Sequence, residues 1–210
     1  MMRNAVLLPL AAALALAGCG ASPAPDTVRQ DATPPAAAPS APTVAGFDKT
    51  LAWQGIGFRV SSPNDSSLGM LKIQPSGLAG ANEAITREVD GRVVGAEVAD
   101  LDANGSPELY VFVQSAGSGS YGSLVALGVN GGKSLSEVFL PDLAEDPRLS
   151  EGYQGHDEFA ILGNALERRF PVYRPGDTNA APSGGTRRVQ YRLEKGEAGW
   201  VLRPEATGGP

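Results

Sequence analysis

One acidic stretch, residues 100–108, carries side chains that could bind a metal ion. Asp100, Asp102 and Asn104 place oxygen atoms at alternate positions, and the glycine that follows permits a sharp turn, as in the first half of a calcium loop. Glu108 stands where a ninth-position ligand would fall, but a valine occupies the twelfth position, so a complete helix–loop–helix site is absent. Two interpretations stay open: a bound Ca²⁺, or a tight turn in which Asp and Asn side chains bond to their own backbone.

A second stretch, residues 115–123, is rich in glycine and serine and holds one large side chain, Tyr121. Glycines keep the chain thin and allow unusual backbone angles, and each hydroxyl can donate and accept a hydrogen bond. Such a loop could enter a narrow cleft of another protein, or it could be a plain hairpin loop. A nucleophilic serine is disfavoured, because neither Ser118 nor Ser120 has glycines both two residues before and two residues after it, as a nucleophile elbow requires.

The chain holds few other residues of the kinds that catalyse reactions. His156 is the only histidine and Cys19 the only cysteine, so neither a zinc site nor a cysteine nucleophile is expected. We expect His156 to be structural, and no spacing of Asp and Glu points to a carboxylate-pair hydrolase. Arg187 or Arg188 could pair with a carboxylate of a partner, although a solvated strand-end charge is the favoured interpretation. The sequence therefore predicts a binding protein rather than an enzyme.

The charge of the chain bears on the kind of partner it can bind. The formal net charge is −6 and no long run of Lys or Arg is present, which argues against nucleic-acid binding. An acidic protein is steered toward basic partners. No cofactor is expected unless residues 100–108 bind Ca²⁺.

The N-terminal 45 residues have the pattern of an exported lipoprotein. Residues 1–18 combine a short basic start with an apolar run too short to span a bilayer, which is typical of a signal peptide. The run ends in Leu-Ala-Gly-Cys, a lipobox, so we expect the mature chain to begin at Cys19 and to carry fatty acyl chains such as palmitate. Residues 19–45, rich in Ala, Pro and Ser, are expected to form an extended tether. The predicted location is the cell envelope, anchored in the outer membrane and facing the periplasm.

Residues 46–205 are expected to form one β-rich domain. Val189, Tyr191 and Leu193 alternate with polar residues, as in a half-buried strand. Residues 109–113 are a continuous apolar run, which suits a central strand covered on both faces.

Turn residues agree with this interpretation. Asn130 and Gly131 predict a hairpin between two apolar runs, and further Gly-containing turns follow near residues 163 and 196. A helix of one or two turns is expected within residues 142–149, where prolines limit its length. The pattern predicts an all-β fold, an antiparallel β-sandwich or barrel with one short helix.

Five segments of the domain occur in an order that resembles the periplasmic inhibitors of invertebrate-type (i-type) lysozyme. The likeness extends from about residue 93 to residue 193 and is faint between residues 47 and 90. The segments are residues 99–109, 115–123, 153–157, 170–173 and 184–187.

The resemblance implies an antiparallel β-sandwich or barrel without catalytic activity, which inhibits lysozyme by placing a Ser-Gly-x-Tyr loop in the active-site cleft. Ser118, Gly119, Ser120 and Tyr121 match this pattern, and the inhibitory roles fall on Ser118 and Tyr121. The implied partner is an i-type lysozyme, and the implied effect is protection of cell-wall peptidoglycan. The lipobox departs from the soluble members of the family. The alternative is a calcium-binding or structural envelope module without a lysozyme target.

Overall fold

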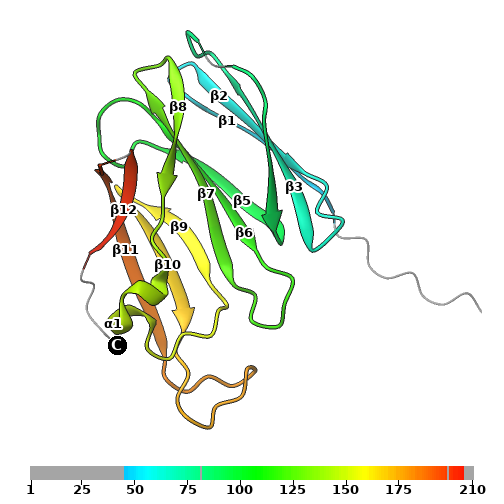
Figure 1. Ribbon diagram of the computed structural model, residues 1–210, viewed down its shortest axis with the longest axis vertical. Helices are drawn as coiled ribbons and strands as arrows, with labels where there is room; N and C mark the ends of the chain where they lie inside the picture. Colours follow the sequence, from blue (N-terminus) through cyan, green and yellow to red (C-terminus); the bar gives the residue numbers. More distant parts are fainter. Residues whose placement is uncertain (1–44, 81, 198, 206–210) are drawn as a thin grey trace, which may run out of the picture. The chain divides into compact units, whose positions relative to one another are not determined.

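The computed structural model describes residues 45–80, 82–197 and 199–205, and these residues form an all-β fold (Figure 1). The predicted signal peptide, Cys19 and all of the predicted tether except its last residue lie outside the described residues. The strands of the described part are β1 (Phe47–Trp53), β2 (Ile56–Ser62), β3 (Leu68–Ser76), β4 (Ile85–Asp90), β5 (Arg92–Ala99), β6 (Glu108–Gln114), β7 (Gly122–Asn130), β8 (Ser134–Phe139), β9 (Glu158–Leu162), β10 (Ala165–Pro171), β11 (Thr186–Lys195) and β12 (Trp200–Glu205).

The first sheet is an antiparallel meander of β1, β2, β3 and β4 in sequence order. No strand was predicted here, although the region was assigned to the domain. Alternate residues of its middle strands are buried, among them Phe58 and Val60 on β2 and Leu71 and Ile73 on β3. This period of two turns one face of the sheet inward.

The second sheet has the order β5-β6-β7-β8-β12-β11-β10-β9 and curls into a nearly closed barrel. Its neighbouring strands are antiparallel except for a short parallel contact, where β8 meets β12 at Val138 and Phe139. The curl brings β9 back toward β6, so that the rings of Phe159 and Phe112 stack at 5.9 Å between centroids. The predicted antiparallel sandwich or barrel is confirmed.

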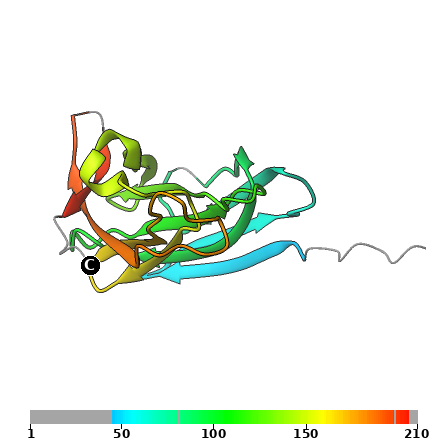
Figure 2. The ribbon, with the colours of Figure 1, turned by 90° about the horizontal axis from the view of Figure 1, so that it is seen from below.

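Strand β6 is the shared wall of two hydrophobic cores. Leu109, Val111 and Val113 pack against the first sheet, whereas Tyr110 and Phe112 point into the barrel. All five side chains are buried, as the continuous apolar run predicted. Figure 2 shows the resulting layers edge-on, with β1 on the side opposite the short helical segment. The loop that follows β6 therefore starts from a strand fixed on both faces.

The hairpin predicted at Asn130 and Gly131 joins β7 to β8 and is confirmed. The Lys133 N–H donates to the Asn130 carbonyl at 3.0 Å, and Gly131 and Gly132 both have positive φ. Such φ values fit the right-handed twist of the paired strands.

The helical segment differs in detail from the helix expected at residues 142–149. It consists of a 3₁₀ turn, Leu143–Glu145, and then α1, Pro147–Ser150. Pro147 begins the helix rather than ending it, because proline lacks an N–H that the first helical position does not use. Asp142 and Asp146 each accept a backbone N–H at the two starts.

Arg187 lies beside the helical segment. Its Nη1 donates to the carbonyl oxygens of Leu149 and Glu151 at 2.9 Å each. The interpretation of Arg187 as a solvated charge at a strand end is therefore wrong, and the side chain fixes the end of α1.

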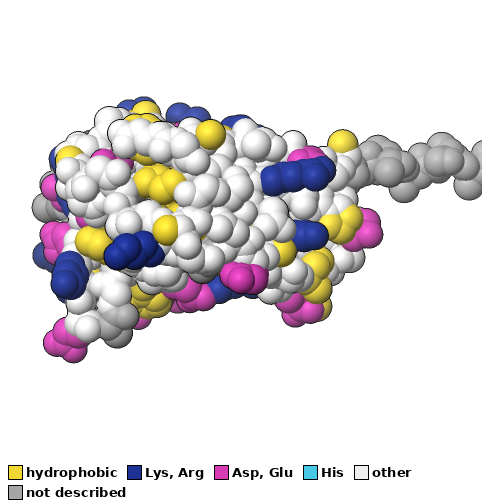
Figure 3. Space-filling model, turned by 90° about the horizontal axis from the view of Figure 1, so that it is seen from above, with side chains coloured by type: hydrophobic (Ala, Val, Ile, Leu, Met, Phe, Trp, Pro, Cys, Tyr) yellow, Lys and Arg dark blue, Asp and Glu magenta, His cyan; other side chains and the backbone are white. Residues whose placement is uncertain are grey.

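No helix in residues 45–80, 82–197 or 199–205 is long and apolar enough to cross a membrane. On the face drawn in Figure 3, basic and acidic side chains are interspersed.

Candidate functional site

The glycine-serine loop, residues 115–121, connects β6 to β7 and is closed at its base. The Ser115 N–H donates to the Tyr121 carbonyl, and the Tyr121 N–H donates to Ser115 Oγ, both at 2.9 Å. At the tip, the Ser120 N–H donates to the Gly117 carbonyl at 2.9 Å. Ser120 has a φ of +44°, a value rare for residues with a side chain. The loop is thus a defined turn on a strand end.

Four residues of this loop are exposed: Ala116, Gly117, Ser118 and Tyr121. Ser118 is exposed, and Tyr121 keeps 49% of its surface accessible. Gly119 and Ser120 are half-buried. The resemblance implies contact roles for Ser118 and Tyr121, and both are accessible to a partner.

A second loop, residues 153–157, packs against the glycine-serine loop and is hydrogen-bonded to it. The His156 N–H donates to the Gly119 carbonyl at 2.6 Å, and the Gly122 N–H donates to Asp157 Oδ2 at 2.8 Å. Gly155 has a φ of +92°, and a Cβ there would collide with the Gly119 carbonyl oxygen. Only glycine fits this close approach of two backbones.

A third loop, between β10 and β11, holds the tip through Asn179. The Asn179 Nδ2 donates to the Ser118 carbonyl at 2.8 Å, and its Oδ1 lies 3.0 Å from His156 Nε2. The Tyr173 hydroxyl donates to the Asn179 carbonyl at 3.0 Å, and its ring stacks on His156. His156 is thus hydrogen-bonded through both its backbone N–H and its ring, as expected. The backbone of Ser118 is used by the protein, while no partner of its hydroxyl lies among the described residues.

The first two loops are held by a buried ion pair to which the sequence analysis gave no role. Arg168 Nε on β10 donates to Asp157 Oδ1 at 2.6 Å, and the two side chains are 7% and 0% exposed. The Tyr153 hydroxyl joins them: it donates to Asp157 Oδ2 at 2.6 Å and accepts from Arg168 Nη2 at 2.7 Å. The second oxygen of Asp157 also accepts the Gly122 N–H, so this carboxylate fixes the start of β7.

The pKa shifts of this network favour its charged, bonded form. Burial lowers the pKa of the Arg168 guanidinium, but the hydrogen bond and charge of Asp157 outweigh burial and raise it overall. Burial and the bond to Asp157 raise the pKa of the Tyr153 phenol, so the hydroxyl stays protonated and can donate. Aromatic rings surround the guanidinium, with Tyr153 and Phe159 at 5.1 and 5.4 Å from its carbon.

Aromatic ring contacts connect Tyr121 to the residues of this network and to the barrel core. Tyr153 meets Phe170 of the barrel core edge-on at 4.8 Å, and Tyr121 meets Tyr153 edge-on at 5.7 Å. The Tyr121 ring also lies over Gly119, where a Cβ would strike it. Tyr121 is exposed on one side and held in place on the other.

The acidic stretch forms a tight turn between β5 and β6. Asp100 accepts the N–H groups of Asn104 and Gly105 at 3.0 and 2.8 Å, and Asp102 accepts the Asn104 N–H at 3.2 Å. These are the side chain–backbone bonds expected of an Asx-type turn.

Three of the four predicted metal ligands also come together. One oxygen each of Asp100, Asp102 and Glu108 lies within 4.8 Å of the others. In the fourth, Asn104, the Oδ1 accepts the Ser106 N–H at 2.7 Å and the Nδ2 donates to Asp102 Oδ2 at 2.7 Å. Oxygen ligands suit Ca²⁺, but each of the three carboxylates already accepts a backbone N–H of this turn.

Glu108 is 2% exposed, whereas Asp100 and Asp102 are only half-buried. Burial raises its pKa to about 7, although the Leu101 N–H that it accepts lowers the pKa and the Asp102 and Asp100 charges raise it further. The Tyr110 hydroxyl also donates to it, at 3.3 Å.

Comparison with protein-family models, characterised proteins and solved structures gave no match.

Sequence reasoning missed the residues that hold the loop. Asp157 and Tyr153 lie in residues 153–157, one of the five segments that carry the resemblance, but the sequence predicted no role for either residue. Arg168 carried a signal, because it takes an inward position between Leu166 and Phe170 on β10. A charged residue in the apolar period of a strand predicts a buried partner.

The ion pair can be tested by stability. Arg168→Met leaves the Asp157 charge buried and unpaired, so we expect the free energy of unfolding, measured in urea, to fall by about 3 kcal/mol or more. Arg169→Met on the same strand removes an exposed pair with Glu158 and is expected to cost under about 1 kcal/mol. Equal losses in the two variants would contradict the assigned role of Arg168.

Glu108 predicts a pH dependence in metal-free buffer. Its folded pKa lies above the ordinary value of 4.5, so its contribution to stability is complete below pH 4.5 and is lost as the pH rises through about 7. The loss is on the order of 3 kcal/mol. We expect thermal unfolding of Glu108→Gln to show a smaller decrease in stability from pH 5 to pH 8 than the parent. Parallel curves for the two proteins would refute the shifted pKa.

Proposed function

We propose that this protein inhibits i-type lysozyme by inserting the glycine-serine loop into the active-site cleft. The observation that supports the proposal is the exposure of Ser118 and Tyr121 on a loop whose backbone is fixed from behind at Ser118, Gly119 and Gly122. The resemblance named above supplies the kind of partner.

The chemistry of the proposed contact follows from the cleft of a glycosidase. Lysozymes hydrolyse sugar with two carboxyl groups in a deep groove. The Ser118 hydroxyl would bond to one of them, which contributes about 1.5–3 kcal/mol. Tyr121 would add buried area and a polar tip, the profile of a residue whose loss costs about 2 kcal/mol or more.

Pre-organisation strengthens this proposal. A loop that must be ordered on binding loses affinity through the entropy of its side chains and backbone. Here the Gly119 and Ser118 carbonyls are bonded to His156 and Asn179 before any partner arrives. Little of the binding free energy would then be lost to ordering the loop.

We propose a binding protein rather than an enzyme. A hydrolase would need a base for Ser118 or Ser120, and the Nε2 of the one histidine is used by Asn179. We also propose, from the N-terminal pattern, that Cys19 is lipidated and that the chain acts in the cell envelope, at the outer membrane facing the periplasm. There it would protect peptidoglycan against lysozyme.

Calcium binding by a structural envelope module is the second candidate function. It is favoured by the approach of Asp100, Asp102 and Glu108 within 4.8 Å of one another. Millimolar Ca²⁺ at pH 7.5 would then raise the melting temperature of the parent and leave that of Glu108→Gln unchanged. Identical melting curves with Ca²⁺ and with chelator would dismiss this candidate.

A lysozyme panel tests the leading proposal. Bacterial lysis by i-type, chicken-type and goose-type enzymes would be measured with and without the protein. Strong inhibition of the i-type enzyme is expected. For the double variant Ser118→Ala, Tyr121→Ala, the concentration needed for half-maximal inhibition is expected to rise by about 100-fold or more. The matched control, Ser134→Ala with Leu162→Ala, removes one exposed hydroxyl and one exposed large side chain away from the loop and should inhibit as the parent does.

Two outcomes would overturn the proposal. Inhibition that survives the double variant rejects the loop mechanism. Failure of the parent to inhibit any lysozyme rejects the function.

A further inference from the structure

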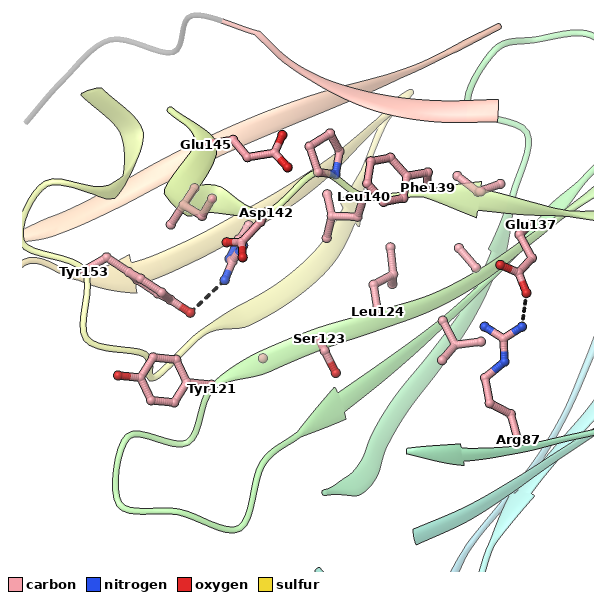
Figure 4. Close-up of a pocket in the computed structure, with 17 residues that line it drawn as sticks. Arg87, Tyr121, Ser123, Leu124, Glu137, Phe139, Leu140, Asp142, Glu145 and Tyr153 are labelled. Atoms are coloured by element: carbon pink, nitrogen blue, oxygen red, sulfur yellow. Dashed lines mark hydrogen bonds and ion pairs between the residues drawn. The ribbon is translucent and has the colours of Figure 1, made fainter. Parts of the chain in front are cut away.

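A groove of about 700 Å³ opens directly beside Tyr121 (Figure 4). One wall is the start of β7, with Ser123 and Leu124, and the other is the segment that leaves β8, with Phe139 and Leu140. The groove therefore continues from the glycine-serine loop along the same surface.

The groove exists because β8 leaves β7 early. Strand β7 pairs with β6 from Gly122 onward, but it pairs with β8 only from Ala126 to Asn130. Val138 pairs with both Ala126 of β7 and Trp200 of β12, whereas Phe139 pairs only with Val201 of β12. From Gly122 to Val125, the edge of β7 that faces away from β6 is thus left without a neighbouring strand.

Part of this edge has free hydrogen-bonding groups. Hydrogen bonds of a strand point alternately to its two neighbours. The Gly122 N–H points away from β6 to Asp157, so Leu124, two residues on, points its N–H and C=O toward the groove as well. In the described part of the chain, no loop or turn residue makes a backbone–backbone hydrogen bond to Leu124.

The groove also offers an apolar side chain and negative charge. Phe139 is 59% exposed at its wall. Asp142 and Glu145 line the same groove, and neither belongs to any ion pair of the described residues. The other charged side chains there are neutralised in pairs, Glu137 by Arg87 and Arg168 by Asp157. The groove is left with two uncompensated carboxylates.

We propose that this groove binds an extended, cationic segment of the protein that the loop contacts. The segment adds backbone hydrogen bonds at Leu124, covers Phe139, and places a lysine or arginine between Asp142 and Glu145. Strand addition of this kind gains affinity from the main chain and specificity from the side chains. The inference rests on the proposed function for the identity of the partner, and it makes the contact larger than one loop.

Two features favour a basic protein segment over other occupants. An unpaired strand edge matches a peptide backbone, which a sugar or a lipid does not provide. The carboxylates and the net charge of −6 favour a cationic partner and faster association at low ionic strength.

The first experiment tests the groove without any lysozyme. The ¹⁵N-labelled protein would be titrated with a blocked pentapeptide that alternates valine and arginine, and separately with its glutamate counterpart. We expect the arginine peptide alone to shift the amide signals of residues 122–125 and 139–145. No shift, equal shifts with the glutamate peptide, or shifts confined to another surface would overturn the groove.

The second experiment measures the affinity for i-type lysozyme of two double variants with the same change in net charge. Asp142→Asn with Glu145→Gln is expected to weaken binding about tenfold at low salt, as charge pairs across an interface do. The control, Glu83→Gln with Glu88→Gln, lies in and before β4, outside the groove, and is expected to bind within about twofold of the parent.

The outcomes separate the two proposals. Equal affinities of the two double variants would show that the lysozyme contact does not use the groove and would overturn this inference, while leaving the loop in place. A parent that binds no lysozyme, yet takes up the arginine peptide in the groove, would refute the proposed function and keep the groove as a site for cationic segments.

Discussion

The buried pair of Arg168 and Asp157 is the constraint on which the candidate site depends. Taking two charges out of water is costly, and their attraction offsets this cost only when the remaining hydrogen bonds are made. Here they are made, because Tyr153 bridges the two groups and the second oxygen of Asp157 accepts the Gly122 N–H. A network of this kind tolerates few other arrangements. It fixes β10, the loop at residues 153–157 and the start of β7 in one geometry.

That geometry explains how a glycine-rich segment can be well defined. Glycine has the largest backbone freedom to lose, so residues 117–119 would have little order of their own. Strand β6, buried on both faces, sets where the loop begins. His156 and Asn179 then hold the Gly119 and Ser118 carbonyls from outside the loop. The divergence of β8 from β7 opens the neighbouring groove, and Tyr121 lines one end of it, so both proposed contacts lie on one continuous surface.

Sequence patterns predicted the local features and missed the distant ones. The apolar run of β6, the alternation in β11 and the Asn130 turn are signals within a few residues, and each was confirmed. The first sheet was missed because burial in it does not follow residue type: on β3 the exposed positions include the apolar Leu68 and Met70, which hides the alternation in the sequence. The contacts that fix the loop join residues 35 and 61 positions apart, such as Gly122 to Asp157 and Ser118 to Asn179. No periodicity within one chain segment reports such pairings.

Backbone ¹⁵N relaxation of the free protein tests most directly whether the loop is held ready for a partner. The account predicts order parameters at residues 117–121 close to those of the neighbouring strands, about 0.85, and a clear drop at these residues in a folded variant that lacks the Asn179 side-chain bonds, Asn179→Ala. Order parameters below about 0.6 in the parent would contradict it, because a mobile loop would have to be ordered at the moment of binding.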